Sequence, residues 1–255
     1  MLDNLTTLLV KTGLSMFFFR KRNKNSDFSA VGVDMHSHLV PGVDDGAKDV
    51  NDSVKLISGL KELGFNRLIT TPHTLQDIHP NTTASLQAGF SLLDGKLPEG
   101  ISVSLSSEYY LDDQFLKQVN AGTVLPLPGN RLLFEFSQIA RPHDLEEQIF
   151  ELGIKGYQLI LAHPERYLFF HKQFSYYTRL KEMGVELQVN ALSLTEHYGK
   201  NIKQIAEKLI EKDMIDFIGT DTHHVKHLET LKLVPQSKHF ARLVDSGLLK
   251  NSSFN

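Results

Sequence analysis

The stretch "VGVDMHSHLVPGVDDGA", residues 31–47, joins an apolar run to two histidines and a pair of aspartates. The apolar run is typical of a buried β-strand. His36 and His38 follow it two positions apart, so both imidazoles point to the same face of the strand. Imidazoles and carboxylates at the end of a buried strand indicate a polar site there, and the rest of the chain shows which kind.

The composition narrows the class of protein. The chain has 255 residues, of which 41% are hydrophobic, and a formal net charge of -3. This length suits one large single-core domain, and the slightly acidic charge argues against a nucleic-acid binder. Its apolar runs are shorter than the roughly 18 residues that a spanning helix needs. Cysteine is absent. This excludes disulfides, thiolate metal sites and the cysteine nucleophile of the common tyrosine phosphatases.

Residues 1–29 are predicted to be an N-terminal extension, in part helical, and residues 30–255 a single domain. The extension begins without positive charge, and Lys11 interrupts its apolar stretch. A signal peptide has the reverse order, so we expect a cytoplasmic protein. Three phenylalanines at 17–19 precede three basic residues at 20–22. This cluster is compatible with peripheral contact to an anionic membrane, although a helix packed on the domain is favoured.

From residue 30 onward, short β-rich runs alternate with helical stretches that often end in glycine. Seven such units are predicted, and several of the strands are almost continuously apolar, as in parallel sheets covered on both faces. A barrel of the TIM type with one strand missing and an open doubly wound sheet both fit this pattern. The predicted strands cover residues 30–36, 66–73, 101–108, 131–137, 157–163, 185–191 and 214–223; the predicted helices cover 50–63, 82–93, 112–119, 143–153, 175–184, 201–212 and 237–247.

Polar side chains end six of these seven strands. In parallel α/β folds the carboxyl ends of the strands carry the catalytic groups. The first and last strands each end in a pair spaced by two, and these pairs become neighbours only if the sheet closes. We therefore favour a closed or nearly closed barrel. The strand-end residues, in chain order, are His36, His38, His73, Glu108, Glu135, His163, Asp221 and His223.

A lone histidine at a strand end is more often a hydrogen-bonded wall residue than a metal ligand. Imidazoles and carboxylates on six strands are a different matter. Carboxylates that converge at a partly buried mouth repel each other and resist desolvation unless cations compensate them. The sequence therefore predicts a metal centre, and ligands without sulfur suit zinc, manganese, iron or cobalt.

Asp45 from the "VDDG" loop brings the candidate ligands to nine, enough to give each of three ions three side chains. Charge also favours three ions. Four carboxylates and one hydroxide carry five negative charges, so two divalent ions leave one negative charge and three leave one positive charge, which attracts a phosphate. Asp34 is expected behind the ligands. The sequence does not decide which of Asp44 and Asp45 turns inward.

Seven motifs in order resemble those of the polymerase and histidinol phosphatase (PHP) superfamily. They are "DMHSH", "VDDG", "TTPH", "SSEYY", "LLFEFS", "LAHPERY" and "GTDTHH", within residues 31–227. More closely, they are similar to the bacterial manganese-dependent protein-tyrosine phosphatases that act on tyrosine kinases of capsule and exopolysaccharide synthesis. "HxH" alone is a weak signal, whereas the ordered set is specific.

The resemblance implies a distorted, TIM-like (β/α)7 barrel with three divalent ions. Manganese is the ion expected from that family, and iron, cobalt and zinc are alternatives. It also implies that Arg166 holds the substrate phosphate, in agreement with the bidentate grip of guanidinium on phosphate. Arg166, Asp45 and His223 are the predicted catalytic residues. Lys226 lies in a region where relatives use arginine, so a second phosphate contact is left open. The predicted metal ligands are His36, His38, Asp45, His73, Glu108, Glu135, His163, Asp221 and His223.

The predicted function is a metal-dependent phosphomonoesterase that hydrolyses phosphotyrosine in a protein, such as a bacterial tyrosine kinase, by attack of a metal-bridging hydroxide. A PHP phosphatase for histidinol phosphate or nucleic-acid ends is an alternative. An amidohydrolase is a second one, but that family uses a metal-bridging lysine where this chain has glutamate. A metal-dependent binding module is a third, which the near-complete ligand set disfavours.

Overall fold

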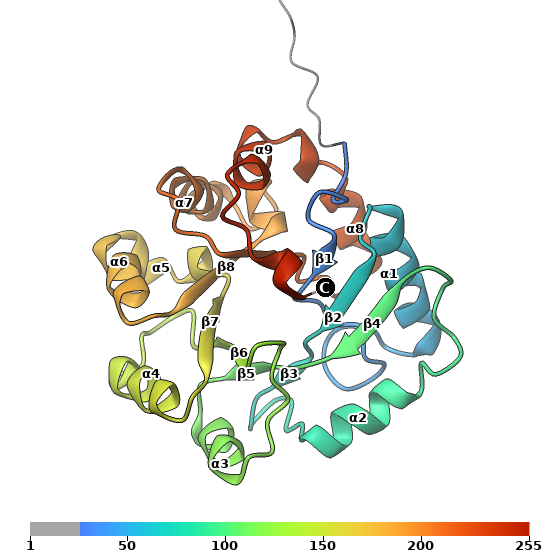
Figure 1. Cartoon of the computed structure of the whole chain (residues 1–255), viewed down its shortest axis with the longest axis horizontal. Coiled ribbons are helices and arrows are strands. Elements are labelled where there is room, and N and C mark those ends of the chain that lie inside the picture. Colours follow the sequence, from blue (N-terminus) through green and yellow to red (C-terminus); the bar gives the residue numbers. More distant parts are fainter. Residues whose placement is uncertain (1–25, 255) are drawn as a thin grey trace, which may run out of the picture.

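The computed structural model describes residues 26–254, in which parallel strands lie at the centre and helices surround them (Figure 1). The strands are β1 (Val33–Asp34), β2 (Arg67–Thr70), β3 (His73–Thr74), β4 (Ser102–Leu105), β5 (Glu108–Tyr110), β6 (Arg131–Glu135), β7 (Gln158–Ala162), β8 (Glu186–Asn190) and β9 (Phe217–Gly219). The α-helices are α1 (Val50–Glu62), α2 (Thr83–Ser91), α3 (Asp113–Ala121), α4 (Leu145–Ile154), α5 (Leu168–His171), α6 (Ser175–Glu182), α7 (Lys200–Glu211), α8 (Val225–Leu231) and α9 (Lys238–Asp245). Short 3-10 helices are η1 (Pro164–Arg166), η2 (Ala191–Leu194), η3 (Val234–Gln236) and η4 (Asn251–Phe254).

Two parallel sheets make up the barrel wall. One has the order β1-β2-β4 and the other the order β3-β5-β6-β7-β8-β9. The strands predicted at 66–73 and 101–108 each divide in two, because β2 runs on into β3 and β4 into β5 after a two-residue break. Pro72 lies in the first break and has no N–H to donate to a ladder. Because of the breaks, β2 and β4 belong to the first sheet and β3 and β5 to the second.

The first and last strands meet and close the ring. Ser37 forms an isolated parallel bridge with Thr222. The Asp221 N–H donates to the His36 carbonyl at 2.7 Å, and the His38 N–H donates to the Thr222 carbonyl at 3.0 Å. The predicted distorted, TIM-like (β/α)7 barrel is confirmed, and the open doubly wound sheet is excluded.

Asp34 stabilises the junction of the first and last strands by hydrogen bonding to Thr220. It is fully buried, and its carboxylate accepts hydrogen bonds from the Thr220 N–H at 2.9 Å and the Thr220 hydroxyl at 2.7 Å. Burial raises the pKa of Asp34 to about 6, although the bonds from Thr220 oppose that rise. As expected, this aspartate lies behind the site residues of its strand.

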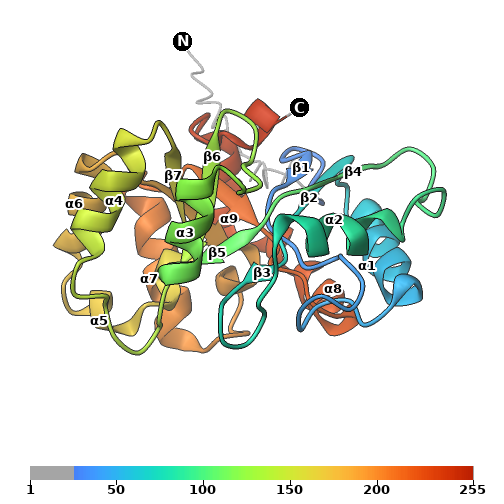
Figure 2. The same cartoon turned by 90° about the horizontal axis from the view of Figure 1, so that it is seen from below.

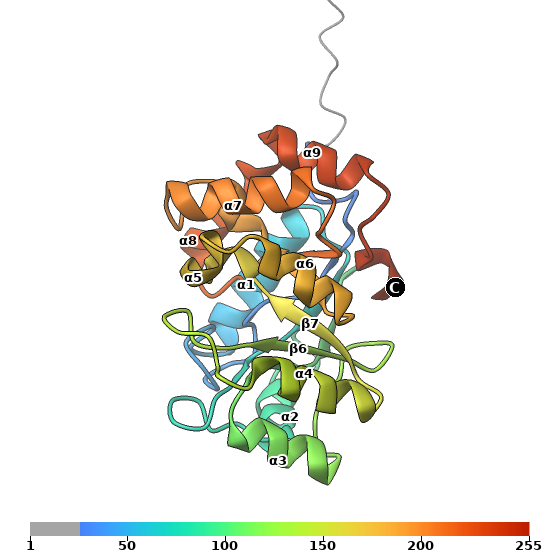
Figure 3. The same ribbon diagram turned by 90° about the vertical axis from the view of Figure 1, so that its left-hand side faces the viewer.

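Helices cover the outside of the wall on all sides (Figures 2 and 3). They turn apolar side chains inward, as α1 does with Leu56, Ile57 and Leu60, all buried in the main hydrophobic core. The Asp49 side chain caps α1 by accepting from the N–H groups of Asn51 and Asp52. Such caps satisfy donors that the first helical turn leaves free. The helix positions predicted from periodicity are confirmed within a few residues.

The structure also differs from the sequence expectations at the first strand, which covers Val33–Asp34 rather than 30–36, and at α5 (Leu168–His171), which was not predicted. The last strand was predicted over 214–223 but ends at Gly219, and the α8 helix that follows, Val225–Leu231, was not predicted. The predicted N-terminal helix lies, up to residue 25, outside the described residues. Within residues 26–254, each helix is too short or too polar to cross a membrane.

Candidate metal centre

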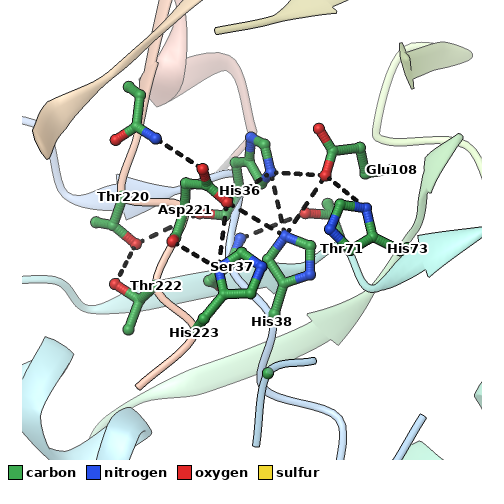
Figure 4. Close-up of polar contacts among 12 residues, drawn as sticks. His36, Ser37, His38, Thr71, His73, Glu108, Thr220, Asp221, Thr222 and His223 are labelled. Atoms are coloured by element: carbon green, nitrogen blue, oxygen red, sulfur yellow. Dashed lines mark hydrogen bonds and ion pairs between the residues drawn. The ribbon is translucent and has the colours of Figure 1, made fainter. Parts of the chain in front are cut away.

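All nine predicted ligands gather at the carboxyl ends of the strands. Their nitrogen and oxygen atoms form four overlapping groups, and within each group the donor atoms lie within 4.8 Å of one another. Figure 4 shows the inner part of this centre, with imidazoles and carboxylates from distant parts of the chain pointing toward one another. The groups are His38, Asp45, His73 and His223; His36, His163 and Asp221; His36, His38 and Glu108; and His73, Glu108 and Glu135.

Glu108 lies in the middle of the centre. It begins β5 and is fully buried. Its Oε2 atom is 3.2 Å from His36 Nε2, 3.5 Å from His38 Nε2 and 3.2 Å from His73 Nδ1. Its Oε1 atom is 3.0 Å from His163 Nε2. One carboxylate therefore faces four imidazoles that come from three other strand ends.

Asp221 forms the second buried acid of the centre. Its Oδ1 atom is 3.4 Å from the Nε2 atoms of His36 and His38 and from His223 Nδ1. Asp221 and His223 face the same site as predicted, but not because they continue a strand. Asp221 has the positive φ of 51°, which turns the backbone after β9 ends. A Cβ at Gly219 would lie 2.6 Å from His36 Cβ, so only glycine fits beside this ring.

The outer edge of the centre is formed by Asp45, His73, His223 and Glu135. The Asp45 side chain is 62% exposed, and its Oδ1 is 3.4 Å from His223 Nε2 and 3.7 Å from His73 Nε2. Glu135, at the end of β6, lies with Oε1 3.2 Å from His73 Nδ1 and Oε2 3.7 Å from His163 Nε2. These side chains are reachable from solvent, whereas the inner ones are not.

Asp44 and Gln188 orient the two inner imidazoles from behind. Asp44 Oδ2 lies 2.7 Å from His38 Nδ1, and Gln188 Oε1 lies 2.8 Å from His36 Nδ1. The Gln188 amide orientation is fixed because its Nε2 donates to the Val189 carbonyl. Each Nδ1 therefore carries the proton, and each Nε2 lone pair points into the centre. This also settles the aspartate pair: Asp44 turns inward behind His38, and Asp45 faces the mouth.

The imidazoles and carboxylates of the centre shift one another's pKa values. Burial alone would lower the pKa of His36, but Glu108 and Asp221 raise it to about 9. Burial alone would raise the pKa of Glu108, but His36 and His73 hold it well below its usual value. The Nε2 atoms of His36 and His38 nevertheless lie only 3.3 Å apart, both aimed at the same carboxylates. Nitrogen and oxygen donors converging in this way fit divalent metal ions.

A cavity of about 370 Å³ opens above the centre. Arg166 lines it from η1, directly after β7, and its Nη1 is 3.1 Å from Asp221 Oδ2. Its position beside the centre agrees with the prediction from "HPERY". The cavity is also lined by Tyr198 and His227, which the sequence did not indicate as site residues. Both lie in segments without a strand-end pattern, so no sequence signal placed them here.

The remaining histidines contribute less to the centre. His79 Nε2 is 4.0 Å from Asp45 Oδ1, at the limit of an ion pair. His239 pairs with Glu207 and Glu211 outside the centre, and His171 bonds to the Glu165 carbonyl. These contacts are typical of wall and surface residues.

Gln188 and Asn190 are two site residues for which a sequence signal existed. Both belong to β8, where polar residues at 186, 188 and 190 alternate with Leu187 and Val189. Residues spaced by two share one face of a strand. A polar stripe on a strand that is buried throughout indicates a face turned toward a polar interior, which is where these amides lie.

Comparisons with known proteins agree with this geometry. Residues 32–240 match the family model described as capsular polysaccharide synthesis, CpsB/CapC. The chain is 29% identical over 198 residues to the tyrosine-protein phosphatase YwqE of Bacillus subtilis, covering 76% of this chain and 78% of that one. It is 23% identical over 202 residues to the tyrosine-protein phosphatase CpsB of Streptococcus agalactiae, covering 76% and 83%.

Solved structures show the same architecture. A structure from the crystallographic work on YwqE of Bacillus subtilis and CpsB of Streptococcus pneumoniae, described as unique metal-dependent tyrosine phosphatases, matches with a TM-score of 0.74 and 27% identity, covering 86% of this chain and 94% of that one. An amidohydrolase from Mycoplasma synoviae matches with a TM-score of 0.50 and 13% identity, covering 89% and 85%. This second likeness concerns the fold alone.

Proposed function

This chain belongs to the CpsB/CapC family of capsular polysaccharide synthesis, and we propose that it hydrolyses phosphotyrosine in proteins as a metal-dependent phosphomonoesterase. The observation that carries the proposal is the convergence of nine imidazole and carboxylate side chains beneath a cavity that also contains Arg166. The relatives named tyrosine-protein phosphatases support the same activity.

Three divalent ions, manganese in the first place, are proposed for the centre, with iron, cobalt or zinc as alternatives. The overlap of the four donor groups supports more than one ion, because a single ion cannot take nine ligands. The proposed ligands are the nine predicted residues. Bound ions would lower the pKa of water and neutralise negative charge on the phosphoryl oxygens.

Arg166 is proposed to bind the phosphoryl group. Its guanidinium lines the cavity and bonds through Nη1 to Asp221, which leaves other N–H donors for substrate oxygens. Guanidinium donors suit phosphate because they are planar and paired. Positive charge at this place also opposes the negative charge that grows during hydrolysis.

Asp45 and His223 are proposed as the other catalytic residues. They line the cavity at the outer edge of the centre, with Asp45 Oδ1 and His223 Nε2 3.4 Å apart. His223 Nδ1 donates to the Asp221 carbonyl at 2.9 Å, which turns Nε2 outward toward Asp45. As proposed ligands at this solvent-facing edge, the two side chains would hold an ion next to the reacting phosphoryl group. A phenolate, with a pKa of about 10, needs less protonation to leave than an alkoxide does.

The proposed substrate is a phosphotyrosine segment of a protein, and specifically a bacterial tyrosine kinase of capsule or exopolysaccharide synthesis. The net charge of -3 supports a protein rather than a nucleic-acid substrate. We further propose that residues 30–255 are the phosphatase domain of a cytoplasmic protein and residues 1–29 its extension. For the apolar and basic cluster at 17–22, outside the described residues, packing on the domain is the favoured proposal and peripheral membrane contact the alternative.

The test uses the purified full chain, stripped with a chelator and reloaded with manganese, iron, cobalt or zinc. Hydrolysis of a phosphotyrosine peptide should vanish on stripping and return with manganese, and metal analysis should find three ions per chain. A phosphoserine peptide, histidinol phosphate and a 5′-phosphorylated oligonucleotide serve as comparison substrates. Full activity without metal, or a clear preference for one of the comparison substrates, would contradict the proposal.

A further inference from the structure

Arg166, the proposed phosphoryl-binding residue, makes few polar contacts with the rest of the protein. Among residues 26–254, its guanidinium makes one side-chain hydrogen bond, to Asp221 Oδ2. A guanidinium has five N–H donors, so the others are left for a ligand. The side chain is 23% exposed and lies on a short 3-10 helix. One hydrogen bond does not fix the guanidinium plane of Arg166, so a further contact is needed to orient it.

Tyr198 provides a second support. The Arg166 Cζ atom lies 4.8 Å from the centroid of the Tyr198 ring. A guanidinium at this distance over an aromatic face is attracted by the ring and prefers a fixed plane. Tyr198 lines the same cavity as Arg166 and lies between η2 and α7. The guanidinium therefore has a ring contact with Tyr198 in addition to its hydrogen bond to Asp221.

Asn190 links the two supports. It is fully buried at the end of β8, and its Oδ1 accepts from the Leu192 N–H at 3.0 Å. That bond fixes the amide orientation, so Nδ2 faces Asp221 Oδ2 at 2.7 Å and the Tyr198 hydroxyl at 3.3 Å. Both N–H groups of the amide are thereby used. Asp221 Oδ2 receives Asn190 and Arg166 together, while Oδ1 faces the imidazoles.

We propose that Asn190 and Tyr198 are positioning residues that fix the Arg166 guanidinium for the substrate phosphoryl group. The amide holds the Asp221 oxygen that receives Arg166, and the tyrosine ring holds the guanidinium plane. The remaining N–H donors of Arg166 then point into the cavity before substrate arrives. A donor that is already in place binds phosphate more tightly, because less freedom is lost on binding.

This inference rests on the proposed function, since it assigns Arg166 to the phosphoryl group. It goes further in stating that phosphate affinity depends on two residues that do not themselves touch the phosphate. A purely structural role for Asn190 and Tyr198 would alter folding or metal content but would not act through Arg166. The test has to separate these cases.

The measurement is the Kd of inorganic phosphate for the manganese-loaded full chain by calorimetry, together with KM and kcat for a phosphotyrosine peptide. Tyr198→Leu removes the ring and should raise both Kd and KM about 3- to 30-fold with a smaller change in kcat. Tyr198→Phe keeps the ring and should restore most of the affinity. Asn190→Asp places a carboxylate oxygen against Asp221 and should raise Kd about tenfold or more.

A matched control comes from α6. The Tyr176 ring carries Arg141 at 4.9 Å, away from the metal centre, and Tyr176→Leu should leave the phosphate Kd unchanged. Metal content and Tm are recorded for each variant. Because the Asn190 variant also touches a proposed ligand, the tyrosine variants decide the question if that variant loses metal.

The decisive experiment is a double-mutant cycle. In an Arg166→Met background, which has no cation to hold, Tyr198→Leu should change the phosphate Kd by less than twofold, because the tyrosine acts through the guanidinium. Equal effects of Tyr198→Leu in both backgrounds, or an unchanged Kd in the wild-type background, would overturn the inference. If the wild-type chain fails to hydrolyse phosphotyrosine at all, the proposed function fails instead, and the phosphate Kd values still test the positioning.

Discussion

The two ends of the barrel both carry buried carboxylates, but they balance them differently. At the amino ends, Glu186 accepts from Arg131 Nε and from Lys250 Nζ, each at 2.8 Å. Asp216 pairs with Lys250 at 2.8 Å and with Lys181. At the carboxyl ends, Glu108, Glu135, Asp45 and Asp221 face imidazoles, and one arginine reaches them.

The difference concerns where the compensating charge comes from. At the amino ends, lysine and arginine carry permanent positive charge, so the protein's own side chains compensate the buried carboxylates. At the carboxyl ends, imidazoles can give up a proton and offer a lone pair, so the carboxylates and imidazoles together can bind cations. A structural ion-pair network and a proposed metal centre thus lie on the same strands, one at each end.

Metal removal should separate the two ends most strongly. Chelation is expected to reduce phosphotyrosine hydrolysis about 1,000-fold or more, since the water and phosphoryl group lose their activating charge. It should also lower the free energy of unfolding by about 3 kcal/mol for each site whose metal is present at about 100 times its Kd. Both are measured on the same sample, by peptide assay and by denaturant unfolding. Equal stability with and without metal would erase the proposed contrast.

Glu108→Gln is the next largest change. It keeps the shape of the side chain but removes the charge that faces four imidazoles. Activity should fall about 1,000-fold, and metal analysis should show fewer bound ions, because a neutral amide is a much weaker ligand than a carboxylate. A variant that retains full metal content and activity would show that Glu108 is not a ligand.

Arg166→Lys should have an intermediate effect. Lysine keeps the positive charge but lacks the planar, paired donors of guanidinium. A fall in kcat/KM of about 10- to 100-fold is expected, with metal content unchanged. Steady-state kinetics on a phosphotyrosine peptide provide the measurement. An equally large loss of bound metal would place Arg166 in the support of the centre rather than in substrate binding.

Glu186→Gln is the matched change at the amino ends and should have the smallest effect on catalysis. It removes the charge that Arg131 and Lys250 share, so the free energy of unfolding should fall by about 1–3 kcal/mol. Activity per folded molecule should stay within about twofold, because Glu186 lies at the other end of the strand from Asn190. A large loss of activity at full stability would show that the two ends are coupled.

The sequence predicted which imidazoles and carboxylates converge, largely because most of their positions follow from strand periodicity. His36 and His38 differ by two residues, and Glu108 and His163 stand at the ends of predicted strands. In a parallel barrel these ends converge whatever the loops do, so the convergence could be inferred without coordinates. Lysines and arginines, whose long side chains reach distant partners, gave no comparable signal: nothing in the sequence joined Lys250 to Glu186.

Contacts within and between loops could not be predicted from the sequence. Tyr198 lies after a 3-10 helix and Arg166 on another, and their approach depends on how both segments turn. The left-handed φ of Asp221 and the short β9 strand were missed for the same reason. Irregular backbone has no periodicity from which side-chain direction can be read.

The sequence by itself determined the number of β/α units, the chemistry of the strand ends and the set of candidate ligands, because local hydrophobic period and residue type suffice for these. Only the tertiary structure decided that Asp44 supports His38 while Asp45 faces the mouth, and that Asn190 and Tyr198 hold Arg166. These relations depend on distances between atoms that are far apart in the chain, and such distances are fixed only when the ring of strands has closed.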